Sequence, residues 1–340
     1  MINILLEIYD NLFNLLKSIL QSFIFILTNA GNFDLIYVRD PIAGTIALIP
    51  KKIFRKKMIH EINGIPDERK LHGNYFLNNG YVFILELAEK ISIKNSDRII
   101  GVTQRLKEYI IKKYGVAENE ISVVPNGVNT AIFHPMNDPR VIQEIKGKLK
   151  ISKEERIVGF VGTLAPWQGL EYLIEAAPLI LKEIPEVRFI LVGDGPMKDD
   201  LEGKIRGLDL EANFIFTGTV PYREVPGYIN ASDVCVVPKK PLKSGYSPLK
   251  LYEYMACGKP VIASRISGFE ILEQNNAGIL VEPENPRDLA KAIIKLLEDD
   301  MLGDEMGRNG REYVVETHSW ESVARKVEKV CKKVFLCERK

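Results

Sequence analysis

"SGYSPLKLYEYMACGKPVIAS" spans residues 244–264 and places a short helix directly before an apolar strand. Ser247 and Pro248 are typical of a helix start, with the serine as N-cap and the proline at the first helical position. Lys250 follows in the turn where the helix dipole prefers an anion, and Glu253 lies one turn further on. A helix start with spare N–H groups and an added cation favours phosphate binding. The stretch therefore predicts an anion site beside a sheet.

Similar apolar, β-branched runs alternate with segments of helical periodicity along the chain. Strands are predicted at residues 34–38, 57–62, 97–102, 121–125, 156–162, 187–193, 213–218, 233–238, 259–264 and 277–282. Most gaps between them are long enough for a crossover helix, such as 169–183 and 222–230. Continuous apolar strands joined by helices predict parallel sheets covered on both faces, which is an α/β fold.

A charged segment with proline and asparagine, residues 133–155, separates four predicted strands from six. The pattern predicts two Rossmann-like domains at 1–150 and 151–318, and a C-terminal helix at 319–340 that crosses back to the first domain. Ligands of such sheets bind at the carboxyl ends of the strands. The loops after the strands of the second domain are therefore expected to carry the chemistry.

Composition narrows the class of function. The 340 residues include 46 Lys+Arg and 45 Asp+Glu, so a net charge of +1 gives no field that favours nucleic acid. The four cysteines lack CxxC spacing, which indicates reduced thiols in a cytoplasmic protein. The four histidines are scattered without HExxH spacing, which argues against a zinc site or a histidine-based triad.

Three predicted strands of the second domain end in glycine, at Gly162, Gly193 and Gly218. Such glycines allow backbone to approach a ligand, and the alternative is that they only form tight turns. Their surroundings fail the GxGxxG spacing, which argues against a dinucleotide dehydrogenase. For Lys250 and Glu253 the alternative is a surface ion pair at i, i+3 spacing.

Four motifs occur in a consistent order: "VVPNGVNTAIFHP" (123–135), "FVGTLAPWQGLEYLIEA" (160–176), "LVGDGP" (191–196) and "SPLKLYEYMACGKPVIAS" (247–264). Together they closely resemble the retaining glycosyltransferases of family 4, which have the GT-B fold. The resemblance runs from about Phe33 to the C-terminus. It implies a nucleotide diphosphate sugar as donor substrate and no cofactor. No metal is expected, because the sequence offers no Asp-x-Asp pair that would bind one with the donor. It also implies a role in polysaccharide biosynthesis of the cell envelope.

The resemblance assigns the donor site residue by residue. Glu253 matches the second glutamate of the E-x7-E motif, which binds the nucleotide ribose, and the helix start matches the segment that cradles the diphosphate. The loop at Thr219 and Val220 matches the segment that holds the base. The donor-binding residues that the resemblance implies are Gly162, Thr163, Gln168, Gly193, Thr219, Val220, Gly245, Tyr246, Ser247, Pro248, Leu249, Lys250 and Glu253.

The sequence departs from the family pattern at several of these positions. Gly245 occupies the place of the first glutamate of E-x7-E, and Thr163 and Gln168 occupy the places of the usual arginine and lysine. Lys250, Lys239 or Lys243 would then have to supply the charge on the diphosphate. We expect Lys250 to take this role and to act in catalysis.

In the first domain, Asn63 falls where many family members carry a histidine beside the donor sugar. Glu61 and Asn63 are expected to act in catalysis on the acceptor side. The alternative is that Asn63 and Gly64 form only a turn.

The N-terminus is expected to form one long amphipathic helix, residues 4–28, that packs on a sheet or on a membrane surface. Family members open instead with a strand and a glycine-rich loop, so the first domain is expected to lack its first strands. A partner chain or a peripheral membrane contact is therefore expected. The basic stretch "KKIFRKK" (51–57) would favour anionic lipid at the inner face of the cell membrane.

The predicted function is transfer of a hexose-type sugar to an acceptor hydroxyl, on a glycan or a lipid-linked acceptor, with retention of configuration. Two alternatives remain open at this point. One is a GT-B sugar-nucleotide epimerase, which would need further acid and base residues in the site. The other is a catalytically impaired binding subunit, which the departures at Thr163, Gln168 and Gly245 favour.

Overall fold

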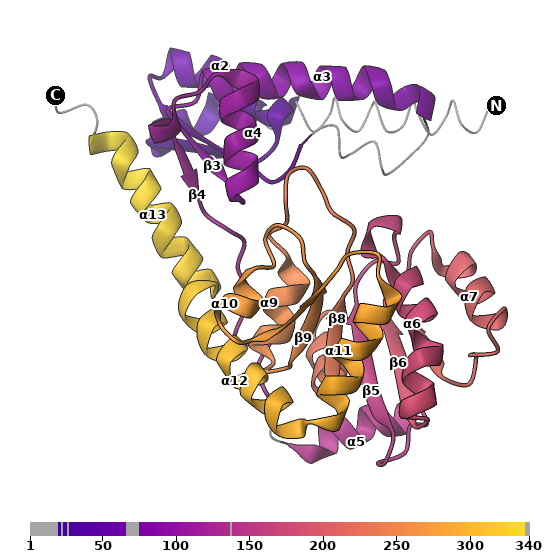
Figure 1. Ribbon diagram of the computed structural model, residues 1–340. Coiled ribbons are helices and arrows are strands. Elements are labelled where there is room, and N and C mark those ends of the chain that lie inside the picture. Colours follow the sequence, from indigo (N-terminus) through magenta and orange to yellow (C-terminus); the bar gives the residue numbers. More distant parts are fainter. Residues whose placement is uncertain (1–19, 22, 26, 66–74, 137, 337–340) are drawn as a thin grey trace. The chain divides into compact units, whose positions relative to one another are not determined.

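The computed structural model describes residues 20–21, 23–25, 27–65, 75–136 and 138–336. The chain divides into two compact units, one of residues 1–125 with 325–340 and one of residues 126–324 (Figure 1). Most of the predicted helix at 4–28 lies outside the described residues, and those described between 20 and 29 are helical.

The first unit contains a parallel sheet of four strands in the order β1-β2-β3-β4. Its strands are β1 (Leu35–Val38), β2 (Lys57–Ile62), β3 (Arg98–Gly101) and β4 (Ile121–Val123). Its helical elements are η1 (Ala30–Asn32), α2 (Pro41–Ile53), α3 (Tyr75–Lys94), α4 (Gln104–Tyr114) and η3 (Glu118–Glu120). Because consecutive strands are neighbours and parallel, α2 and α3 are crossover helices that run in the same direction.

Local sequence explains where these helices begin and end. The carboxylate of Asp40 accepts hydrogen bonds from the N–H groups of Ile42 and Ala43, and Pro41 occupies the first turn of α2. Thr103 caps α4 through the N–H of Leu106, and Gly115 ends the same helix at a φ of +65°. These caps fix the loops that leave the carboxyl ends of β1 and β3.

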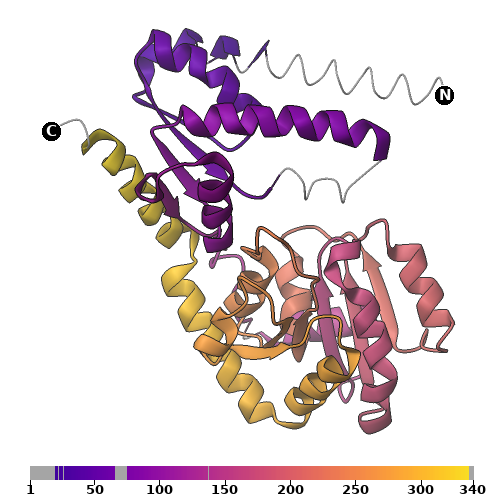
Figure 2. The same cartoon turned by 45° about the horizontal axis from the view of Figure 1, so that its top comes forward.

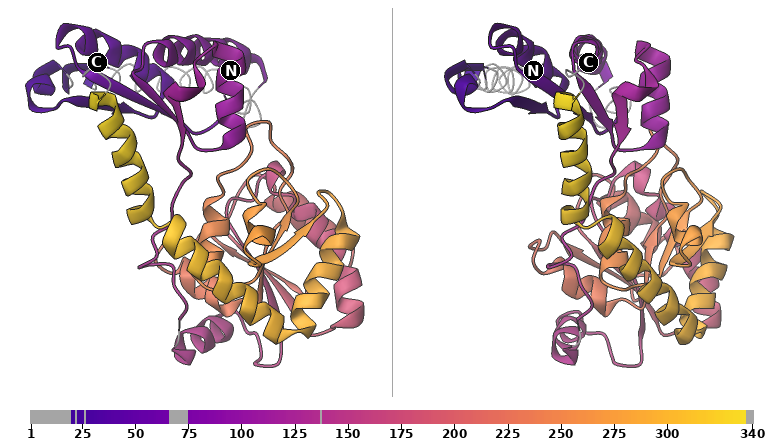
Figure 3. Two further views of the ribbon diagram at one scale, coloured as in Figure 1. Left: turned by 60° about the vertical axis from the view of Figure 1, so that its left-hand side comes forward. Right: turned by 90° about the vertical axis from the view of Figure 1, so that its left-hand side faces the viewer.

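The second unit contains a parallel sheet of six strands in the order β10-β9-β8-β5-β6-β7. Its strands are β5 (Arg156–Val161), β6 (Val187–Val192), β7 (Phe214–Gly218), β8 (Val234–Val237), β9 (Val261–Ser264) and β10 (Gly278–Val281). The order reverses between β5 and β8. At such a switch point the loops diverge and leave room for a ligand. Figures 2 and 3 show the two sheets from other sides.

Helices cover both faces of the six-stranded sheet. The helical elements between residues 126 and 317 are α5 (Pro139–Lys148), η4 (Pro166–Gln168), α6 (Leu170–Glu183), α7 (Lys198–Arg206), α8 (Val225–Ala231), α9 (Leu249–Ala256), α10 (Ile271–Gln274), α11 (Pro286–Glu298) and α12 (Asp300–Thr317), and α13 (Trp320–Leu336) follows them. One core lies between the sheet and α6, α7 and α11, and another lies between the sheet and α8, α9, α10 and α12. The strands are therefore buried on both sides, as their continuous apolar sequences predict.

The prediction of an α/β fold with two parallel sheets is confirmed, and all ten predicted strands are present within two residues at each end. The division between the units falls near residue 125 rather than near 150. The reason is that α5 packs on α8, and Ile145 and Ile151 join a buried cluster with Ile157 of β5. Residues from Arg325 onward, most of α13, group with the first unit.

Candidate active site

Three glycines lie at the carboxyl edge of the six-stranded sheet, where β5, β6 and β7 end. Gly162, Gly193 and Gly218 have φ values of +143°, +132° and +68°. The N–H of Gly193 donates to the carbonyl of Gly218 at 3.0 Å. A Cβ on Gly193 would lie 2.2 Å from the carbonyl oxygen of Gly162, whereas a Cβ on Gly162 would lie 2.6 Å from Nζ of Lys250. The close approach of the two turns requires a glycine at position 193, whereas the absence of a side chain at Gly162 leaves space for the ammonium of Lys250.

Lys250 is the second residue of α9 and reaches back toward the loop after β5. Its ammonium donates to Oε1 of Gln168 at 2.9 Å and lies 3.9 Å from the ring centroid of Phe160. Burial lowers the pKa of Lys250 well below its usual value, Lys239 lowers it further, and the charge of Glu253 opposes both effects. An ammonium has three donors, so it can also bind an anion. Such an anion would favour the charged form of Lys250 and so oppose the effect of burial on its pKa.

The start of α9 differs from the prediction in its cap. Helix α9 begins at Leu249, and Pro248 is its N-cap without a side-chain hydrogen bond. The expected assignment of Ser247 as N-cap is wrong because its hydroxyl accepts a hydrogen bond from the N–H of Asn126 at 2.8 Å. The first turn of α9 therefore has no side-chain cap, and its N–H groups, at the positive end of the helix dipole, could bind an anion.

Glu253 lies one turn further along α9. Burial raises its pKa to about 7, although the charge of Lys250 acts in the opposite direction. No ion pair joins Lys250 to Glu253 in the described part of the chain, so the alternative of a surface pair is not what the structure shows. A partly buried carboxylate has lost hydrogen bonds to water, so hydrogen bonds from the hydroxyl groups of a ligand would stabilise its charged form.

The loop after β7 brings an aromatic residue near this carboxylate. Burial and the charge of Glu253 raise the pKa of Tyr222, whose ring packs edge-on against Phe133 at 5.4 Å. Thr219 is exposed and Val220 is half-buried in the same loop. The sequence analysis missed Tyr222, because only the fold brings this loop close to α9.

Gln168 and Thr163 lie in the loop between β5 and α6 and have different surroundings. Gln168 is buried and holds the ammonium of Lys250, whereas Thr163 is exposed. Gln168 therefore positions the cation.

A second lysine lies near Lys250. The ammonium of Lys239 lies 4.2 Å from the ring centroid of Tyr246, and burial lowers its pKa to about 8. Tyr246 is held in place by its hydroxyl, which donates to the carbonyl of Lys240 at 2.8 Å, and Gly245 precedes it at a φ of +68°. Lys243 is exposed. Of the two additional lysines considered, Lys239 is the one that influences Lys250.

In the first unit, parallel pairing brings together the ends of β1 and β2. Glu61 accepts hydrogen bonds from the hydroxyl of Tyr37, from Nε of Arg39 at 2.8 Å and from Nδ2 of Asn63 at 3.1 Å. Arg39 also donates to Oδ1 of Asn63 at 3.3 Å. Glu61 and Asn63 are thus hydrogen-bonded to each other, and Tyr37 and Arg39 are partners that the sequence analysis missed.

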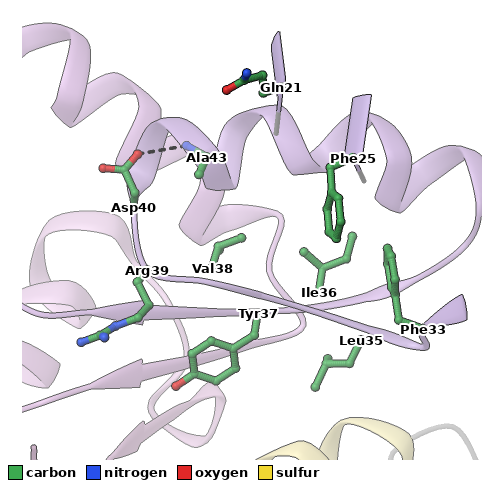
Figure 4. A pocket seen from close by; sticks show the side chains of 10 residues that line it. All are labelled: Gln21, Phe25, Phe33, Leu35, Ile36, Tyr37, Val38, Arg39, Asp40 and Ala43. Carbon is green, nitrogen blue, oxygen red and sulfur yellow. Dashed lines mark hydrogen bonds between the residues drawn. The ribbon is translucent and has the colours of Figure 1, made fainter. Parts of the chain in front are cut away.

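An apolar pocket with a volume of about 760 Å³ lies along β1 in the same unit. Figure 4 shows Phe25, Phe33 and Ile36 gathered on one side of the strand, with Tyr37 and Arg39 on the other.

The described residues contain no group of three or more His, Cys, Asp or Glu side chains that could hold a metal ion. Among the helices that the structure describes, none is long and apolar enough to cross a membrane.

Comparisons with known proteins give the following matches. Residues 141–313 match the family described as Glycosyl transferases group 1, and residues 8–132 match Glycosyltransferase Family 4. An uncharacterized glycosyltransferase of Methanocaldococcus jannaschii is 27% identical over 90% of this chain and 77% of its own length. The UDP-Gal:alpha-D-GlcNAc-diphosphoundecaprenol alpha-1,3-galactosyltransferase of Escherichia coli is 27% identical over 85% of this chain and 72% of its own.

A solved structure shares the fold. HepE from Anabaena, crystallised in complex with UDP-glucose, superposes with a TM-score of 0.75 at 22% identity, covering 92% of this chain and 82% of that one.

Proposed function

The chain belongs to the family of glycosyl transferases group 1 and is a glycosyltransferase, and we propose that it moves a sugar from a nucleotide diphosphate sugar to an acceptor hydroxyl with retention of configuration. The observation that carries this proposal is the start of α9. There a helix terminus without a side-chain cap, the half-buried ammonium of Lys250 held by Gln168, and the half-buried carboxylate of Glu253 lie within one turn.

The donor is bound from its diphosphate outward. Lys250 and the first turn of α9 bind the diphosphate, because both present positive charge to it. Glu253 accepts hydrogen bonds from the vicinal hydroxyls of the ribose. The main chain at Thr219 and Val220 contacts the base, and Tyr222 flanks it. Gly162 keeps the floor of the site open for Lys250.

The reaction breaks the bond between the anomeric carbon and the diphosphate oxygen, and a bond from the acceptor oxygen forms on the same face of the sugar. The departing diphosphate accepts the proton of the acceptor hydroxyl, so a protein nucleophile is not needed. Lys250 stabilises the charge that develops on the leaving oxygen. Glu61 and Asn63, held by Tyr37 and Arg39, act on the acceptor side.

The acceptor is proposed to be a glycan or a lipid-linked hydroxyl in polysaccharide biosynthesis. The name of the E. coli relative, which includes diphosphoundecaprenol, supports a lipid-linked acceptor. The corresponding location is the cytoplasm, in peripheral contact with the inner face of the cell membrane.

A binding screen tests the donor site. Calorimetry with UDP, GDP and ADP and their glucose conjugates should find one base that binds in the micromolar range. If the nucleotide binds but no nucleoside diphosphate is released from the nucleotide sugar, the chain is a binding subunit instead. Absence of binding to all three would contradict the proposal.

A further inference from the structure

Two helices of the first unit expose apolar side chains on one side of each. On α2 these are Ile49, Ile53 and Phe54 at its end, and on α3 they are Phe83, Ile84, Leu87 and Ile91. Ile53, Phe83 and Ile84 are 62%, 66% and 57% exposed. The spacing of 84, 87 and 91 puts these residues on one stripe of the helix, and 49 and 53 form another. We call the two stripes together the α2–α3 outer face.

Helix packing places both stripes on the same side of the unit. Helices α2 and α3 contact each other through Thr45, whose hydroxyl donates to the carbonyl of Ala88 at 2.9 Å. Ile49 and Ile53 lie roughly 40° and 80° around α2 from Thr45 at 100° per residue. Ile84 and Ile91 lie roughly 40° and 60° around α3 from Ala88 in the opposite sense. Because the helices run in the same direction and contact each other along this seam, the two stripes point the same way.

The opposite sides of both helices are occupied by the fold. Ala47 and Leu48 of α2 pack with Ile36, Val38 and Met58 of the sheet. On α3, the hydroxyl of Ser92 lies 2.9 Å from Nδ1 of the buried His60. The outer face is therefore the side of α2 and α3 that the sheet does not cover.

Basic residues border this face. Lys52 and Arg55 are exposed at the end of α2, and Lys90 and Lys94 are exposed on α3. The acidic residues of α3 are engaged elsewhere, since Glu86 pairs with Lys113 at 2.6 Å and Glu89 is buried against the hydroxyl of Tyr114.

Charge is also divided between the units. The first unit carries 23 Lys+Arg and 15 Asp+Glu, a net charge of +8, and the second carries 23 and 30, a net charge of −7. The net charge of the whole chain is near zero although its first unit is strongly basic, and the α2–α3 outer face belongs to this basic unit.

We propose that the α2–α3 outer face binds the surface of an anionic lipid bilayer. Apolar side chains bordered by lysine and arginine match the interfacial region of such a bilayer, where acyl chains lie below anionic headgroups. A second copy of the chain is a poorer partner, because pairing two such faces would bring like charges together. This contact identifies the surface for the peripheral location proposed above.

Vesicle binding tests this contact without any nucleotide sugar, so its failure would leave the proposed transferase activity unaffected. The full chain is centrifuged with phosphatidylcholine vesicles and with vesicles of phosphatidylcholine and phosphatidylglycerol in equal parts. We expect binding to the anionic vesicles at least tenfold tighter than to the neutral ones, weakening as salt rises.

Two double variants separate the apolar and the electrostatic contributions. Ile84→Ser with Leu87→Ser, and Lys90→Glu with Lys94→Glu, should each weaken binding at least tenfold. All four side chains are exposed, so these changes should leave the fold intact. The matched controls are Leu208→Ser with Met301→Ser and Lys182→Glu with Lys291→Glu, which change exposed residues of the second unit and should bind like the wild type.

Equal binding by the two vesicle types, or equal losses in the variants and their controls, would overturn the proposal. Sedimentation velocity without lipid adds an independent check. If the wild type dimerises and the Ile84→Ser, Leu87→Ser variant is monomeric, the face is an interface between copies and the lipid assignment is wrong.

Discussion

Replacement of Glu253 by glutamine should raise the stability of the free protein and lower its affinity for a nucleotide. Burial raises the pKa of this carboxyl from 4.5 to about 7. A raised carboxyl pKa means that the folded chain holds a proton more tightly than the unfolded chain does. The associated stability is present below pH 4.5 and is lost as the pH rises through about 7.

The size of the effect follows from the shift. A change from 4.5 to about 7 corresponds to roughly 3 kcal/mol of folding free energy. Glutamine has nearly the same shape and no charge to bury, so Glu253→Gln should be more stable than the wild type at pH 8. The two should have similar stability near pH 4.5. Urea unfolding at both pH values measures this difference.

Nucleotide binding should change in the opposite sense. A carboxylate hydrogen-bonded to ribose hydroxyls contributes about 1–3 kcal/mol, so Glu253→Gln should raise the Kd of the nucleoside diphosphate about 5- to 150-fold at pH 8. The 2′-deoxy nucleotide should lose much less. Glu273→Gln is the control, because Glu273 is an exposed carboxylate paired with Arg265 at 2.7 Å, and its replacement should alter neither measurement by more than about 1 kcal/mol.

Two outcomes would refute this reasoning. If Glu253→Gln is no more stable than the wild type at pH 8, the carboxylate is not dehydrated in the free protein. If its affinity for the ribonucleotide is unchanged, Glu253 does not bind the ribose.

Two further substitutions test other parts of the site. Lys250→Ala should weaken binding of the nucleoside diphosphate about 10- to 100-fold but that of the free nucleoside less than twofold, because only the diphosphate carries the charge that Lys250 binds. Equal losses of affinity for the two ligands, measured by calorimetry, would indicate a structural role. Gly193→Ala should destabilise the fold by about 2 kcal/mol or more, because a Cβ there would lie 2.2 Å from the carbonyl of Gly162 at a positive φ. Its control, Gly203→Ala in α7, meets no atom within 4 Å and should stabilise by about 0.5–1 kcal/mol. Equal unfolding midpoints for these two glycine variants would show that the turn after β6 tolerates a side chain.

The strands of both sheets could be predicted from the sequence because each is marked by a short run of neighbouring residues. Each strand is a continuous apolar run, and a run such as "RIVGFVG" is buried on both faces wherever it lies in a parallel sheet. The same reasoning located Lys250 and Glu253 on one helix at the edge of the second sheet.

Contacts between distant segments could not be predicted in this way. Ser247 has the sequence of an N-cap, but its partner Asn126 lies 121 residues away. Gln168 meets Lys250 across 82 residues, and Tyr37 meets Glu61 across 24. Such pairs depend on strand order, which composition and periodicity do not encode.

The composition of the whole chain also gave no sign that its two units carry opposite net charges. A net charge of +1 gives no overall field that favours nucleic acid, whereas the first unit carries a net charge of +8 and the second a net charge of −7. The first unit is also the one with the exposed faces of α2 and α3.

Turnover of a nucleotide sugar tests the central claim most directly. The purified chain is incubated with UDP-, GDP- and ADP-glucose and with the corresponding N-acetylglucosamine and galactose donors where available, and the released nucleoside diphosphate is measured. We predict release from donors of one base, with water or an added sugar as acceptor, and a rate at least tenfold lower for Lys250→Ala. Release that is equally fast in the Lys250→Ala variant, or binding of the nucleotide without any release, would contradict the claim that the start of α9 supports sugar transfer.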